Sequence, residues 1–225
     1  MNRMHTIRAE ELLQYTNREI PIYVIGAGSV GSYTVKSLAA MGFSNITIFD
    51  DDNVSEENIG NQDFMVSQIG LNKANQLANN MHMFYKASIQ AINQRFSKNT
   101  VGLASKCIVI MAVDSMSARK LIFETLIETK VKARIIDCRM SIQCLNLFCL
   151  DITDKESRDN YKKTLYSDNE AVQESCTNKA VAFTSLLAGG LVSKIAVQFA
   201  DKKCDSSWKS LIYDIENFDM IYHSN

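Results

Sequence analysis

The stretch YVIGAGSVGS, residues 23–32, decides the fold of this 225-residue chain. Its apolar run breaks at Gly26, Gly28 and Gly31, which follow the spacing G-x-G-x-x-G. Such glycines make a tight turn between a strand and a helix, where the backbone approaches a phosphate and helical N–H groups point at it. The turn suits the pyrophosphate of NAD as well as the triphosphate of ATP, so residues further along must distinguish the two.

Apolar runs alternate with amphipathic segments through the first half of the chain. This alternation predicts the α/β class, with a doubly wound, Rossmann-like, mostly parallel sheet. The C-terminal half is predicted to add antiparallel strands, a polar irregular segment over 152–175, and a long helix from about Cys176. Strands are predicted at 22–28, 45–50, 88–96, 107–114, 133–140, 142–151 and 210–222 (one or two), and helices at 8–15, 30–43, 66–81 and 117–129.

Composition narrows the classes of protein that fit. The net charge of −1 gives no reason to expect nucleic acid or an anionic membrane as a partner. The six cysteines never form C-x-x-C, so no zinc is expected, and free thiols together with a charged N-terminus predict a cytoplasmic protein. The apolar stretch 181–200 carries Lys194 and Gln198, which favours a buried core helix over a membrane span.

Acidic residues follow two of the predicted strands. Asp50 lies 19 residues after Gly31 (50 − 31), where a carboxylate accepts hydrogen bonds from ribose hydroxyls of either nucleotide. Asp114 follows another strand and is interpreted as an oxygen ligand for Mg²⁺, with a helix N-cap as the competing interpretation. Lys73 favours ATP, because a fixed cation neutralises charge as a phosphoanhydride breaks and does nothing for hydride transfer.

Four motifs occur in order over roughly residues 20–120. They are GAGSVGS, then D-x-D-x-V-x-x-x-N across Asp50–Asn58, then G-x-x-K at Gly70–Lys73, then V-D-S-x-x-x-R at Val113–Arg119. Together they resemble the ubiquitin-activating-type adenylyltransferase family (ThiF/MoeB/HesA-like). The resemblance implies an ATP-dependent nucleotidyltransferase that adenylates the C-terminal carboxylate of a small ubiquitin-fold protein with a glycine tail.

The resemblance also implies roles for individual residues and an organisation of the chain. Lys73 and Asp114 would be catalytic, with Asp114 holding Mg²⁺. Residues 1–225 would form one adenylation domain, in which a leading helix (1–18) precedes a nucleotide-binding half (19–130) and a partner-binding and dimerisation half (131–225) of a homodimer. Nucleotide would be bound by Gly26, Gly28, Gly31, Asp50, Asp52, Asn58, Gln62 and Lys73.

One position departs from the family pattern. An arginine usually precedes the loop glutamine, but here Asn61 precedes Gln62. The charge is either supplied by Arg3 or Arg8 of a neighbouring subunit, or by Arg139 of the same chain, or is missing. Arg119 is interpreted as a structural partner of the loop carboxylates.

Cys176 raises a second mechanistic question. It lies at the predicted start of the long helix, where backbone N–H groups lower a thiol pKa. Its position resembles that of the cysteine that forms a thioester or acyl disulfide with the activated protein in several relatives. The competing interpretation is a small buried residue at the end of a core helix.

Two other classes of function stay open at this point. The absence of the family arginine at Asn61 is compatible with a catalytically weakened nucleotide-binding interaction module. The glycine turn and Asp50 alone are also compatible with an NAD-dependent oxidoreductase, although no residue is apparent that would take part in hydride transfer.

Overall fold

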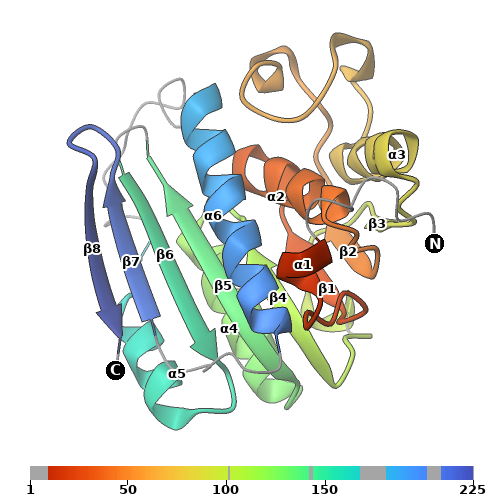
Figure 1. Cartoon of the computed structure of the whole chain (residues 1–225). Helices are drawn as coiled ribbons and strands as arrows, with labels where there is room; N and C mark the ends of the chain where they lie inside the picture. Colours follow the sequence, from red (N-terminus) through yellow and green to blue (C-terminus); the bar gives the residue numbers. More distant parts are fainter. Residues whose placement is uncertain (1–9, 101, 142–143, 168–180, 202–208, 225) are drawn as a thin grey trace.

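The computed structural model describes the chain except residues 1–9, 101, 142–143, 168–180, 202–208 and 225. One eight-stranded sheet runs through the described part, in the order β3-β2-β1-β4-β5-β6-β7-β8 (Figure 1). The first five strands in this order are parallel, and β5 to β8 pair antiparallel. The strands are β1 (Ile22–Ile25), β2 (Ile46–Phe49), β3 (Gln90–Ile92), β4 (Lys106–Met111), β5 (Lys132–Met140), β6 (Cys144–Asp151), β7 (Lys209–Asp214) and β8 (Asp219–Ser224).

Helices cover the two faces of the sheet, as expected for a doubly wound fold. The helices α2 (Ser29–Ala40), α3 (Lys73–Tyr85) and α6 (Ala182–Ala200) pack on one face, and α4 (Met116–Glu128) and α5 (Lys155–Lys163) pack on the other. Strand β4 shows why its sequence is continuously apolar: Ile108 and Ile110 join the first core, and Val109 joins the second. The predicted fold class, including the antiparallel strands of the C-terminal half, is confirmed.

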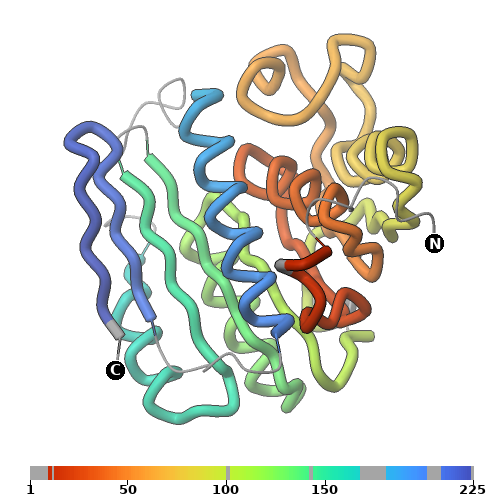
Figure 2. The backbone as a smooth tube through the Cα atoms, viewed as in Figure 1, coloured from red at the N-terminus to blue at the C-terminus, as the bar shows by residue number. Residues whose placement is uncertain are grey.

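The strand order reverses its direction between β1 and β4. Strands β2 and β4 lie on opposite sides of β1, so the connections after β1 and β4 leave toward different faces of the sheet. In open α/β sheets this reversal is where ligands bind, beyond the carboxyl ends of the strands. The glycine turn after β1 and Asp114 after β4 both lie there. The long connection between β2 and α3 extends from the same end of the sheet (Figure 2).

The predicted helix over 66–81 is wrong in its bounds. A short 3₁₀ turn covers Val66–Gln68, and α3 begins only at Lys73 and runs to Tyr85. The break falls at Gly70, whose φ of 87° is left-handed, and Asn72 then caps a new helix. Ile69, which falls before this break, is 38% exposed, whereas Leu77 within α3 is buried.

The segment predicted to be irregular contains a helix. Helix α5 begins where the side chain of Asp154 accepts a hydrogen bond from the Ser157 N–H at 2.7 Å, which is an N-cap. Its sequence is polar almost throughout, so it lacks the apolar stripe that predicts a helix. Within α5, Tyr161 is the one residue whose aromatic ring is buried against the sheet.

Helix α6 begins at Ala182, and residues 168–180, including Cys176, lie outside the described part. Of the described helices, it alone is long and apolar enough to span a bilayer by length and composition. It packs closely along α2 and against β4 and β5. The helices approach closely at Gly189, where an added Cβ would lie 2.6 Å from the Cβ of Tyr33 in α2.

Because of this close crossing, alanine substitutions at two adjacent glycines should change the stability of the fold in opposite directions. We expect Gly189→Ala to destabilise the fold by about 1–3 kcal/mol, because the helices must separate. Gly190→Ala is the matched control, since no atom lies within 4 Å of its added Cβ. It is expected to stabilise α6 by up to about 1 kcal/mol through helix propensity. Urea unfolding measures both, and equal effects of the two variants would contradict the close crossing.

Candidate nucleotide-binding site

The glycine turn has the geometry that its spacing predicts. Gly26 has a φ of 98°, and a Cβ there would overlap the carbonyl oxygen of Ala112 after β4. A Cβ on Gly31 would overlap the carbonyl oxygen of Gly26, so both positions require glycine. Gly28 differs, because the nearest atom to its added Cβ is Gln62 Nε2 at 4.0 Å. The space over Gly28 is therefore open at the start of α2, where helical N–H groups favour an anion.

Asp50 ties this turn to the end of β2. One of its oxygens accepts a hydrogen bond from the Ala27 N–H at 2.6 Å, and the other accepts from the Asp52 N–H at 2.9 Å. Burial raises the pKa of the Asp50 carboxyl, and these two N–H donors partly offset the increase. The residue predicted to bind ribose therefore also shapes the phosphate turn.

Asn72 is a residue of the site that the sequence analysis missed. Its Nδ2 donates to the carbonyl oxygens of Asp50 and Asp52, both at 3.0 Å, and to Asn93 Oδ1 at 2.8 Å. Its Oδ1 accepts from the Asn75 N–H at 3.1 Å and so caps α3. An asparagine just before a helix is a recognisable N-cap signal, but its bonds to the β2 end are long-range.

Lys73 follows Asn72 in the chain and is the first residue of α3. Its backbone N–H donates to the Asp52 carbonyl at 2.9 Å, and its Nζ lies 3.2 Å from Asp52 Oδ2. The Lys73 side chain is 10% exposed and that of Asp52 is 59% exposed. The structure thus brings a nearly buried cation to the carboxyl edge of the sheet, paired with a carboxylate that faces outward.

The loop between β2 and α3 holds the other predicted residues. Asn58 Oδ1 accepts from the Ser55 N–H at 3.0 Å, so this side chain caps the 3₁₀ turn Glu56–Asn58. Gln62 borders Gly28, and its Oε1 is buried without a hydrogen-bond partner in the described structure. Such an acceptor is costly unless a ligand or water donates to it. Neighbouring Asp63 forms an ion pair with Lys36, 2.6 Å from its Nζ.

Asp114 is exposed at the carboxyl edge of β4. It is not the cap of α4, because Ser115 has that position and its Oγ accepts from the Ala118 N–H at 3.3 Å. This placement weakens the competing interpretation from sequence. Within the described residues, no group of three His, Cys, Asp or Glu side chains gathers to hold a metal ion. Mg²⁺ at phosphates usually needs only one or two carboxylates, a requirement that Asp114 meets.

Of the four arginines considered from the sequence, the two in the described part of the chain bind one buried carboxylate. Arg119 Nε and Arg139 Nε each lie 2.8 Å from an oxygen of Asp137, which is fully buried on β5. Arg119 is therefore structural, but the partner predicted for it, a loop carboxylate, is wrong. Arg139 also donates to the Thr164 carbonyl at 2.8 Å and stacks over Phe148, so its guanidinium is engaged by these residues as well as by Asp137. Arg3 and Arg8 lie outside the described residues.

The described cysteines belong to the sheet. Cys107, Cys138 and Cys149 are buried, whereas Cys144 is half-buried. Burial raises the pKa of the Cys107 thiol to about 12, which leaves it protonated and unreactive at neutral pH. Cys176, the predicted nucleophile, lies outside the described residues.

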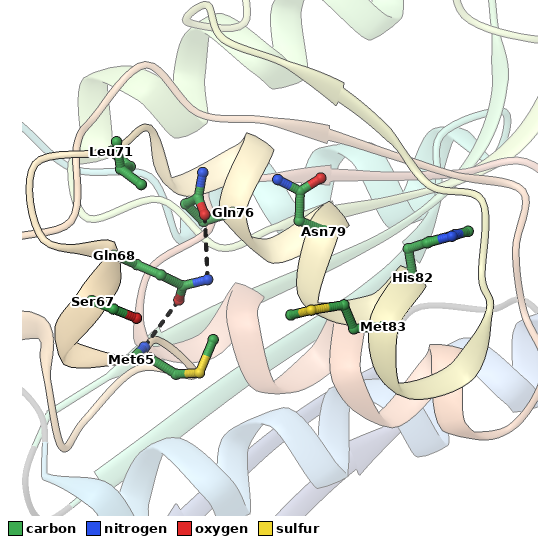
Figure 3. A pocket seen from close by; sticks show the side chains of 8 residues that line it. All are labelled: Met65, Ser67, Gln68, Leu71, Gln76, Asn79, His82 and Met83. Carbon is green, nitrogen blue, oxygen red and sulfur yellow. Dashed lines mark hydrogen bonds between the residues drawn. The ribbon is translucent and has the colours of Figure 1, made fainter.

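A separate cavity of about 450 Å³ lies between the loop before α3 and the outer side of α3 (Figure 3). Across it, Gln68 donates to Gln76 at 3.3 Å and accepts from the Met65 N–H at 2.9 Å. None of the residues predicted to bind nucleotide lines this cavity. Its lining consists of Met65, Ser67, Gln68, Leu71, Gln76, Asn79, His82 and Met83.

Comparison with known proteins identifies the family. The model of the ThiF family matches residues 2–224, nearly the whole chain. The chain belongs to the ThiF family. The resemblance drawn from the four sequence motifs is thereby confirmed, and the ThiF fold accounts for the parallel half with its antiparallel extension.

Individual relatives are distant. A segment of 57 residues is 39% identical to the adenylyltransferase and sulfurtransferase UBA4 of Yarrowia lipolytica, covering 25% of this chain and 14% of that protein. Escherichia coli MccB, crystallised with AMPCPP and MccA, has a TM-score of 0.76 at 14% identity, over 99% of this chain and 72% of that one. The E. coli tRNA N6-threonylcarbamoyladenosine dehydratase TcdA, crystallised with ATP, has a TM-score of 0.65 at 19% identity, over 88% of this chain and 94% of that one. At these identities the two structures show the shared fold.

Proposed function

We propose that this ThiF-family chain is an adenylyltransferase that uses ATP and Mg²⁺ to activate a carboxylate. The observation that carries the proposal is the meeting of three features at one sheet edge. They are the open glycine turn at Gly28, the nearly buried Lys73 and the exposed Asp114. Adenylation needs all three, because two anions must be brought together while negative charge builds on the leaving pyrophosphate.

The residues present fit ATP. The α2 N-terminus and the space over Gly28 accommodate phosphates, and the buried Gln62 Oε1 offers an acceptor to a donor group of a ligand. Asp50 lies where ribose hydroxyls would reach it. An NAD-dependent oxidoreductase would use the turn and Asp50, but it would have no use for Lys73 or for the exposed carboxylate of Asp114.

The proposed reaction is a displacement at the α-phosphorus. A carboxylate oxygen of the substrate forms a bond to the α-phosphorus, and the bond from that phosphorus to the oxygen bridging to the β-phosphorus breaks. Pyrophosphate leaves, and the product is an acyl adenylate. Lys73 moves from Asp52 to the phosphates, where its charge stabilises the transition state. Mg²⁺, when bound to Asp114 and the phosphates, supplies further neutralising charge.

We propose a small ubiquitin-fold protein with a C-terminal glycine tail as the substrate. This choice is supported by the four sequence motifs and by the similarity to UBA4. Residues 19–130 would bind nucleotide, while residues 131–225 would bind the partner and form a cytoplasmic homodimer. We further propose that the Cys176 thiolate attacks the acyl carbon of the adenylate, so that a thioester forms, the bond from that carbon to the phosphate oxygen breaks, and AMP leaves. Neither nucleic acid nor a membrane is required by this scheme.

Asn61 supports a second candidate, a nucleotide-binding interaction module with little catalytic power. The family arginine is absent there, and the guanidinium of Arg139 is engaged with Asp137 and Thr164. In that case the chain would bind ATP, and a partner protein would bind the ATP-bound form of the chain. The two candidates differ in turnover and not in affinity for nucleotide.

Exchange of labelled pyrophosphate into ATP distinguishes the candidates. The assay contains Mg²⁺ and candidate small proteins ending in glycine, such as products of adjoining reading frames. The adenylyltransferase predicts exchange that requires one of these proteins and is lost in Asp114→Ala. ATP binding without exchange in the presence of any candidate protein would favour the interaction module. Saturable NAD binding that ATP does not compete with would favour the oxidoreductase.

A further inference from the structure

The segment that carries Asp114 is held by one buried guanidinium. Arg119 Nη2 donates to the Val113 carbonyl, and its Nη1 donates to the Ser115 carbonyl at 3.1 Å. These carbonyls lie on the two sides of Asp114 in the chain. The first belongs to the peptide bond that leads into Asp114, so the two bonds together restrain the backbone on both sides of Asp114.

The guanidinium is itself held in place. Arg119 Nε lies 2.8 Å from Asp137 Oδ1, and Arg119 Nη2 also donates to the Cys138 carbonyl at 3.3 Å. The other Asp137 oxygen accepts from Arg139 Nε at 2.8 Å and from the Tyr161 hydroxyl at 3.0 Å. The Arg119 side chain is 6% exposed and that of Asp137 is fully buried. Arg119 therefore has no access to a nucleotide at the surface and acts only through the segment that it binds.

We propose that Arg119 is a positioning residue that sets the direction of the Asp114 carboxylate toward nucleotide-bound Mg²⁺. The inference rests on the proposed function, because it assigns Mg²⁺ to Asp114. Residues that orient a metal ligand typically change metal affinity by about 10- to 100-fold when they are replaced. A buried arginine that only filled space would have no such effect on magnesium.

The planar fork of arginine is what the geometry requires. It binds the Asp137 carboxylate and the backbone carbonyls of Val113, Ser115 and Cys138 at the same time. A lysine at this position keeps the charge for Asp137 but not the fixed set of donors. Arg119→Lys therefore keeps a positive charge beside Asp137 but removes the hydrogen bonds that restrain the backbone around Asp114. Arg158→Lys is the matched control, since Arg158 in α5 also donates to a backbone carbonyl, that of Ile152 at 2.7 Å, which lies near the start of β5 and not at its carboxyl end.

The test measures ATP binding by calorimetry, once with Mg²⁺ and once with EDTA. The ratio of the two dissociation constants is the magnesium effect. We expect Arg119→Lys to reduce this effect by about tenfold or more, while ATP binding in EDTA changes less than about threefold. Asp114→Asn should abolish the effect, and the double variant should be no worse than Asp114→Asn alone. Arg158→Lys should leave it unchanged, and thermal unfolding confirms that each variant is folded.

Asp114→Glu keeps the proposal testable if Arg119→Lys proves too unstable to measure. On a rigidly held backbone, one added methylene displaces the carboxylate, so the magnesium effect should fall by a similar factor. A wild-type magnesium effect that survives both Arg119→Lys and Asp114→Glu would overturn the positioning role alone. So would ATP binding by the wild type that Mg²⁺ does not strengthen. A wild-type chain that does not bind ATP would overturn the proposed function, and the positioning role with it.

Discussion

Lys73→Met is expected to lower the rate of pyrophosphate exchange by about 10²- to 10³-fold, the usual loss when one preorganised charge at a transition state is removed. The Lys73 side chain is only 10% exposed, so solvent screens its charge weakly. Its partner Asp52 is 59% exposed, so removing the lysine leaves no buried carboxylate without a cation. The free energy of unfolding should therefore change by less than about 1 kcal/mol. Steady-state exchange rates and urea unfolding of the same preparation measure the two effects.

Lys98→Met is the control for this variant. Lys98 also forms an ion pair, at 2.8 Å from Glu128, but both side chains are about half exposed and remote from the glycine turn. Its exchange rate should equal that of the wild type. A Lys73→Met enzyme with wild-type exchange would remove Lys73 from the chemistry and would favour the interaction module.

Asp137→Asn is expected to destabilise the fold by about 3–5 kcal/mol. Asp137 is fully buried and pairs with both Arg119 and Arg139, so its neutralisation leaves two guanidinium groups with an uncompensated charge. The Tyr161 hydroxyl, which donates to the same carboxylate, loses its charged acceptor as well. Chemical denaturation at neutral pH gives the free energy of unfolding. For Asp159→Asn, on the exposed side of α5, the change should stay within about 0.5 kcal/mol.

A change of less than about 1 kcal/mol in Asp137→Asn would contradict this account of the buried cluster. In that case, water or a shift of α5 must solvate the arginines. Hydrogen exchange at Val113–Ser115 in the folded variant would then show whether Arg119 still holds the Asp114 segment.

The parallel half of the sheet could be predicted because its signals are local. A strand buried on both faces reads as an unbroken apolar run, and the three glycines fix a turn whose close contacts the structure bears out at Gly26 and Gly31. Asp50 and Asp114 each follow a predicted parallel strand, and such strands end on the same side, so both could be expected at one sheet edge.

What the sequence analysis missed depends on contacts between distant segments. The start of α3 was misplaced because Ile69 continues a helical pattern that the left-handed Gly70 interrupts. Helix α5 lacked an apolar stripe, since a single ring, that of Tyr161, anchors it. The partner of Arg119 was misassigned because Arg119 is in α4 and Asp137 lies 18 residues further along the chain, on β5. An acid inside the apolar run ARIIDCRM was the available signal, because a buried carboxylate needs a cationic partner.

The most direct test of the central claim follows the oxygen that attacks the α-phosphorus. A substrate protein with an ¹⁸O-labelled C-terminal carboxylate is incubated with the chain, ATP and Mg²⁺, and hydroxylamine captures the activated acyl group. Carboxylate attack predicts that the AMP released by this capture carries one ¹⁸O in its phosphate, as measured by mass spectrometry. Unlabelled AMP, or ADP and phosphate as the products, would contradict adenylation of a carboxylate at this site.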